Sequence, residues 1–88
     1  MIIPKTVEEA ISILENDFTQ EDRDYLKENG AIGVHMSLGR WIRNNWGLWK
    51  EEPNELKKSL IEKGFSHPDD MSNYIIEEYI KKYLKNEI

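Results

Sequence analysis

The chain contains no cysteine, which excludes disulfide bonds and metal sites built from thiolates. It also lacks any apolar run near the roughly 18 residues that a membrane-spanning helix needs. Its first residues, Met-Ile-Ile-Pro-Lys, have neither the basic segment nor the long apolar stretch of a signal peptide. We therefore expect a cytoplasmic protein with no membrane association.

Glycine and proline are scarce, at five and three residues of 88. No proline-rich linker, internal repeat or low-complexity tract divides the chain, and a chain of this length has room for one hydrophobic core. Hydrophobic residues make up 39% of the sequence and aromatic residues 10%, which argues against disorder. We therefore expect residues 1–88 to form a single domain.

Basic residues are outnumbered by acidic ones, 12 against 17, which gives a formal net charge of -5. A field of this sign repels phosphate backbones at long range, so the composition disfavours nucleic-acid binding. An acidic balance is common among cytosolic proteins. The charge therefore identifies no particular partner.

Apolar residues recur at helical spacing in five segments, and no segment has a convincing strand pattern. Thr6 with Glu9 predicts a capping box at the start of the first helix, and Thr19 with Asp22 repeats this signal more weakly. Gly30 is placed to end the second helix. The pattern predicts an all-α fold, a compact bundle of about five short helices.

The third and fifth helices are expected to pack together. The third is predicted over residues 34–46, and the fourth runs from Asn54 to Gly64. The fifth is predicted over residues 69–86, and its apolar face is wider than half the helix, so it should contact two neighbours and form the centre of the bundle. The same width allows a homodimer, although a five-helix monomer could cover the face equally well. The face comprises Met71, Ile75, Ile76, Tyr79, Ile80, Tyr83 and Leu84.

All three tryptophans lie between His35 and Trp49. An ideal helix, at about 100° per residue, places Trp41 and Trp49 near the centre of the apolar face and Trp46 at its edge. Trp46 is therefore predicted to be partly exposed. Asn45 falls near the apolar centre, and because a buried amide needs a partner, we expect it to bond a backbone group of a neighbouring segment.

Tryptophan and arginine together are typical of binding hot spots between proteins. The first functional hypothesis is therefore a non-enzymatic protein-interaction module, of the adaptor, immunity or antitoxin type. It would bind a protein partner through the region from Arg40 to Trp49, where Trp46 is the tryptophan expected at the surface and Arg40 is expected to be free.

The second hypothesis is a small-ligand or enzymatic site. Arg40, Arg43 and Asn44 would clamp a carboxylate or phosphate, because the planar guanidinium matches such groups. The competing structural interpretation, which we favour, pairs Arg43 with the acidic start of the fifth helix and so joins that helix to the third. The full set of residues proposed for this site is His35, Arg43, Asn44, His67, Asp69 and Asp70.

Catalytic and metal signatures are weak. No Ser-His-Asp set, phosphate-binding glycine loop or nucleotide fingerprint is present. His35 and His67 have no spacing typical of metal ligands, and Asp69 with Asp70 is typical of helix capping. We therefore expect no metal, no cofactor and no catalytic residue, and we favour a protein that is not an enzyme.

Two motifs carry a family resemblance. The first comprises His35, Gly39, Ile42, Arg43, Asn44, Gly47, Leu48 and Trp49, and the second comprises Gly64, His67, Pro68, Asp69, Asp70, Met71 and Ser72. Together they resemble a family of small bacterial domains of unknown function, over roughly residues 4 to 84. The resemblance implies that the two segments meet in space. It implies no activity or substrate.

Overall fold

Residues 2–84 are described by a computed structural model, and within them the chain forms five α-helices and no strand. This confirms the predicted all-α class. The predicted extension of the fifth helix to residue 86 lies partly outside the described residues. No described helix is long and apolar enough to cross a membrane. The elements are α1 (Val7–Asp17), α2 (Gln20–Gly33), the π-helical turn η1 (His35–Gly39), α3 (Arg40–Asn45), α4 (Glu55–Glu62), α5 (Pro68–Tyr79) and the π-helical turn η2 (Ile80–Leu84).

Short-range caps set the helix starts. The Thr6 hydroxyl accepts the backbone N–H of Glu9 at 3.1 Å. Thr19 and Asp22 make both hydrogen bonds of a capping box, at 3.1 and 2.9 Å. The capping box with the weaker sequence signal is therefore the one that forms completely. Each bond satisfies a backbone donor that the first turn of a helix leaves unpaired.

Gly30 bends α2 instead of ending it. Its φ of 71° and ψ of -178° break the helical geometry, and one further turn follows to Gly33. Glycine adopts a positive φ without the steric penalty of a Cβ atom. The prediction that the helix stops at Gly30 therefore identified the break correctly but missed the additional turn.

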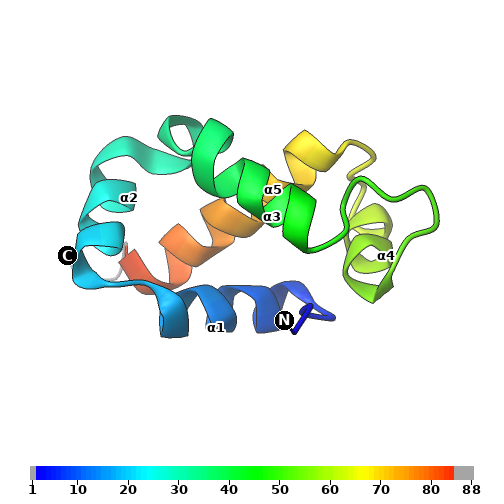
Figure 1. Ribbon diagram of the computed structural model, residues 1–88, viewed down its shortest axis with the longest axis horizontal. Coiled ribbons are helices and arrows are strands. Elements are labelled where there is room, and N and C mark those ends of the chain that lie inside the picture. The colour runs from blue at the N-terminus through cyan, green and yellow to red at the C-terminus, as the bar shows by residue number, and fades with distance from the viewer. Residues whose placement is uncertain (1, 85–88) are drawn as a thin grey trace.

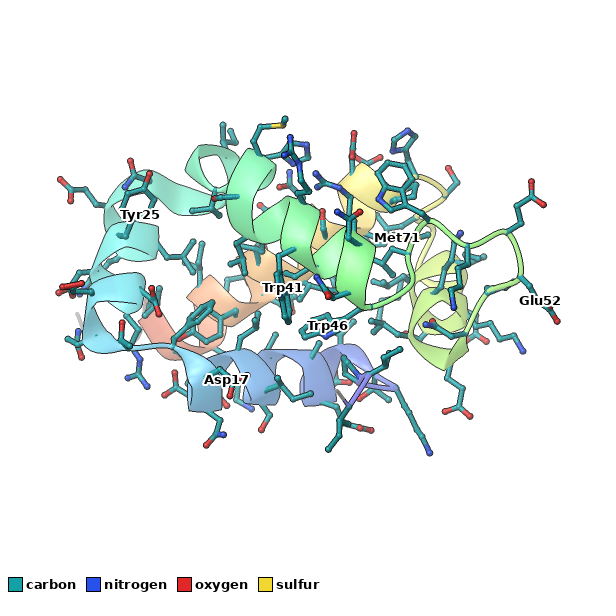
Figure 2. All side chains as sticks on the ribbon, in the orientation of Figure 1. Asp17, Tyr25, Trp41, Trp46, Glu52 and Met71 are labelled. Carbon is teal, nitrogen blue, oxygen red and sulfur yellow. The ribbon has the colours of Figure 1, made fainter. Side chains whose placement is uncertain are left out.

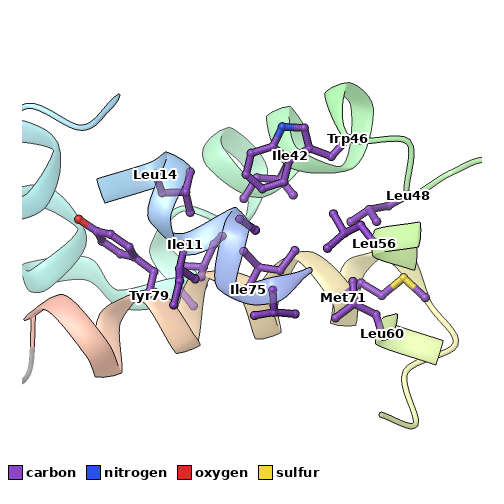
Figure 3. Close-up of a cluster of buried hydrophobic side chains, with 14 of the residues drawn as sticks. Ile11, Leu14, Ile42, Trp46, Leu48, Leu56, Leu60, Met71, Ile75 and Tyr79 are labelled. Carbon is purple, nitrogen blue, oxygen red and sulfur yellow. The ribbon is translucent and has the colours of Figure 1, made fainter. Parts of the chain in front are cut away.

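The fifth helix lies at the centre of the bundle, as predicted. In Figure 1, α5 runs behind α3, with α1 along the lower edge and α2 and α4 toward opposite ends. The third and fifth segments contact each other through η1, α3 and α5, and α5 also contacts α1 and α2. Figure 3 shows the core that these contacts create, formed by Ile11, Leu14, Ile42, Trp46, Leu48, Leu56, Leu60, Met71, Ile75 and Tyr79.

The π-turn η1 changes which side of the third segment faces the core. The N–H of Gly39 donates to the carbonyl of Val34 at 3.0 Å, a span of five residues instead of the four of an α-helix. This additional residue shifts the helical register by one position, about 100°. The buried residues of the segment are therefore Val34, Gly39, Ile42, Arg43 and Trp46.

The tryptophan prediction is wrong for this reason. Trp46 is completely buried, whereas Trp41 is 41% and Trp49 53% exposed. The one-residue shift turns position 46 inward and position 41 outward, and Trp49 lies beyond the end of α3, where a helical wheel no longer applies. Asn45 is also displaced from the apolar centre. It is half-buried, and its amide donates to the Trp41 carbonyl of its own helix at 2.8 Å, not to a neighbouring segment.

Candidate functional site

Arg43 occupies the centre of the region that the sequence singled out. Its side chain is only 5% exposed. Nη1 donates to the Ser72 hydroxyl at 2.9 Å and Nη2 to the His35 carbonyl at 3.3 Å. Nε lies 3.4 Å from Asp69 Oδ1, at an angle that makes this contact an ion pair and not a hydrogen bond. Arg43 therefore joins α3 and η1 to the first turn of α5, while Asp70 is exposed and contributes nothing to this contact.

Gly39 provides the space for this guanidinium. A Cβ atom at position 39 would lie 2.9 Å from Arg43 Nη1 and 3.6 Å from Ser72 Oγ. The backbone there is ordinary right-handed helix, with φ -58° and ψ -46°. Close approach, and not a special conformation, is thus the reason for glycine. The approaching group is a side chain of the same chain.

Both histidines lie close to Asp69. His35 Nε2 is 3.9 Å from Oδ1, and His67 Nδ1 is 3.8 Å from Oδ2. His67 Nδ1 also accepts the backbone N–H of Asp69 at 3.2 Å and so acts as the N-cap of α5. Within residues 2–84, no three His, Asp or Glu side chains are grouped closely enough to hold a metal ion.

Of the other predicted residues, Trp46 is buried, whereas Arg40, Asn44 and Trp49 lie at the surface. Trp49 Nε1 donates to Asn44 Oδ1 at 3.0 Å, and its ring and that of His67 form a T-shaped pair with centroids 6.5 Å apart. Arg40 is exposed and has no hydrogen bond or ion pair within residues 2–84. The alternative clamp of Arg40, Arg43 and Asn44 is therefore not assembled in this geometry, whereas the favoured pairing of Arg43 with the start of the fifth helix is present through Asp69. The register shift at η1 places one arginine outside and the other inside.

Trp41 lines a groove that the sequence did not reveal. Its ring packs edge-to-face on Trp46, with centroids 5.6 Å apart and an interplanar angle of 73°. Both rings line an open groove of about 580 Å³ between α3 and α1, and Figure 2 shows both labelled side chains between these two helices. The remaining lining residues are Ile2, Ser12, Ile13, Asn16 and Asp17.

A second polar cluster joins helices that are distant in sequence. The Tyr79 hydroxyl donates to Glu15 Oε1 at 2.9 Å, and Arg23 Nη2 lies 3.0 Å from Glu15 Oε2. Burial of Tyr79, together with the hydrogen bond to Glu15 and its negative charge, raises the pKa of the phenol well above its usual range. Tyr79 lies in the core, as its place on the apolar face of residues 71–84 predicted, but no local pattern indicates its partner Glu15, which is 64 residues away.

Replacing Tyr79 with phenylalanine is expected to reduce the stability loss at alkaline pH. Unfolded tyrosine ionises near pH 10, so the stabilisation from a raised folded pKa is complete below that pH. It is lost as the pH rises toward the folded value, at up to about 1.4 kcal/mol per pH unit. At pH 8 the variant should be less stable by about 0.5–1.5 kcal/mol because the hydrogen bond is lost, and this difference should shrink by pH 11.

Urea unfolding at both pH values measures this difference, with Tyr25→Phe as the matched control because Tyr25 is 57% exposed. A difference for Tyr79→Phe that stays constant between pH 8 and pH 11 would show that the phenol does not contribute to the alkaline loss.

Comparison with known proteins gives a family and no activity. A family model described as a domain of unknown function, DUF6794, matches residues 3–83. No curated protein and no solved structure matches the chain. Since the family model covers nearly the whole sequence, including both motifs around Arg43 and Asp69, the chain belongs to the DUF6794 family.

Proposed function

We propose that this protein is a non-enzymatic interaction module of the bacterial cytoplasm, of the adaptor, immunity or antitoxin type. It binds a protein partner through the exposed part of the Arg40–Trp49 region. The observation that carries the proposal is the exposure of two tryptophans, 41% for Trp41 and 53% for Trp49, next to the exposed Arg40, which has no ion pair among the described residues. Tryptophan and arginine are the residues most enriched in binding hot spots.

Both exposed rings are held in place by the protein itself. Trp41 packs against the buried ring of Trp46, and Trp49 is tied to Asn44 by a hydrogen bond. The two tryptophan side chains are therefore already ordered before a partner binds, which lowers the entropic cost of association.

The alternative ligand site has less support from the geometry. The guanidinium of Arg43 is buried, and its contacts are with Ser72, the His35 carbonyl and Asp69 of the same chain. A carboxylate or phosphate would have to displace these partners and open the junction between α3 and α5. The internal contacts therefore favour a structural role for Arg43.

We expect an affinity pull-down from native lysate to retain one stoichiometric protein with wild-type bait and to lose it with Trp41→Ala or Arg40→Glu. Removing a hot-spot side chain weakens binding by about 2 kcal/mol or more, a factor of about 30. The retained protein is identified by mass spectrometry, and its affinity for each purified variant is then measured by calorimetry.

Two variants of α4 serve as matched controls. Ile61 is 47% exposed, close to the value for Trp41, so Ile61→Ala tests the loss of any exposed apolar side chain. Lys58→Glu reverses an exposed cation as Arg40→Glu does. The proposal would be contradicted if the wild-type bait retained no protein. It would also be contradicted if the two variants of α3 and the two of α4 retained the partner equally.

A further inference from the structure

We infer that the groove between α1 and α3 binds a basic amphipathic helix of the partner protein. Its apolar side chains would enter the groove and its lysines or arginines would face α1. This inference rests on the proposed function and specifies its partner.

Apolar side chains from both helices line the groove and are in place without a partner. Trp46 lies beneath the groove and is fully buried, while Trp41 and the half-buried Ile13 line the groove from α3 and α1. Ile2, 80% exposed, adds further apolar surface at the groove. An apolar helix face laid between two helices buries such surface, with anchoring side chains at i, i+3, i+4 and i+7.

The charges beside the groove are negative. Asp17 is the one charged residue among those that line it, and α1 carries no lysine or arginine. Glu9 lies three and four positions before Ser12 and Ile13, and is therefore on the same face of α1. Glu9 and Asp17 are both exposed, and neither has an ion pair within residues 2–84. The negative charge on the α1 side of the groove is thus complementary to cationic side chains.

On the α3 side, neither arginine presents its positive charge to the groove. Arg43 is buried at the junction with α5. Arg40 precedes Trp41 by one residue and is therefore turned about 100° away from it. Asp17, which lines the groove, and Glu9, which lies on the same face of α1, therefore have no compensating charge from α3.

The spacing of these acids fits a helix. Glu9 and Asp17 are eight residues apart on α1, which corresponds to about 12 Å at 1.5 Å per residue. Basic residues two turns apart on a partner helix lying along α1 would match this distance. A second copy of the chain is a poorer occupant, since a two-fold contact through this groove would bring both sets of acids together.

The test is a phage-display selection of helical peptides against the full chain, with the apolar and flanking positions randomised. Enriched peptides are synthesised, and their affinities are measured by fluorescence anisotropy. We expect an excess of lysine and arginine on one flank, and a loss of about tenfold or more in affinity with Trp41→Ala. The double variant Glu9→Lys, Asp17→Lys should weaken binding by a similar factor, whereas Glu28→Lys on α2 should leave it unchanged.

The outcomes separate this inference from the proposed function. The inference is overturned, and the proposed function left standing, by peptides whose affinity depends on Trp41 but which lack a basic flank. Peptides whose affinity is unchanged by the charge reversals have the same meaning. A selection without enrichment, or peptides indifferent to Trp41, overturns the inference. The lysate experiment with Arg40→Glu then decides the function. Because Glu9 and Asp17 are exposed, their variants remain informative even if Trp41→Ala fails to fold.

Sedimentation of the isolated chain tests self-association. A wild-type dimer that Trp41→Ala dissociates would assign the groove to a second copy and overturn the inference. We expect a monomer with both proteins.

Discussion

Replacing Arg43 with alanine is expected to lower the free energy of unfolding by about 2–4 kcal/mol. The change removes both hydrogen bonds that link the guanidinium to Ser72 and to the His35 carbonyl, and it empties a buried volume between α3 and α5. The Asp69 side chain is 43% exposed, so water can solvate the carboxylate that loses its partner. The loss should therefore lie below that of a fully buried ion pair.

Urea unfolding followed by circular dichroism measures this loss. Arg40→Ala is the matched control, because Arg40 is exposed and has no hydrogen bond or ion pair within residues 2–84, so its loss should change stability by no more than about 0.5 kcal/mol. Arg43→Lys should fall between wild type and Arg43→Ala, since a single ammonium cannot reach all three partners. Equal unfolding midpoints for Arg43→Ala and Arg40→Ala would show that Arg43 does not hold the helices together.

Gly39 offers an independent check of the same contact. Gly39→Ala should destabilise wild type, because the new methyl group would approach Arg43 Nη1 to 2.9 Å. In the Arg43→Ala background this clash is absent, and alanine should instead stabilise the helical backbone by up to about 1 kcal/mol. A double-mutant cycle reports the difference. Independent effects of the two changes would contradict the close approach.

Replacing Trp46 with alanine is expected to have the larger effect, about 3–5 kcal/mol of destabilisation. Trp46 is completely buried in the core between α3 and α1, and its ring also supports Trp41. A domain of this size has a total stability of about 5–10 kcal/mol or less. The variant should therefore approach the unfolded state under mild conditions.

Thermal unfolding of Trp46→Ala is compared with that of Trp41→Ala. Trp41 is 41% exposed, so its removal should cost about 2 kcal/mol or less. Trp46→Phe keeps much of the buried area and tests whether volume accounts for the effect. A larger loss for Trp41→Ala than for Trp46→Ala would mean that Trp41, and not Trp46, faces the core.

Local patterns in the sequence were enough to predict the helices and to favour one contact between distant segments. Capping residues such as Thr19 with Asp22 act within a few positions, and the apolar spacing of residues 71–84 is a local property; both can be read without coordinates. The pairing of Arg43 with the start of α5 was also predicted, because an acidic helix start is a ready partner for arginine. Only Asp69 of the two acids takes part.

Which side chains of the third segment face the solvent depends on tertiary packing. The π-turn at His35–Gly39 adds a residue to one turn, and no apolar period distinguishes it from an α-helix, so Trp41 and Trp46 exchanged their predicted positions. The groove on Trp41 and the bond from Tyr79 to Glu15 depend on how α1 packs against α3 and α5. Such contacts join residues far apart in the chain, where local spacing carries no information, and packing alone sets them.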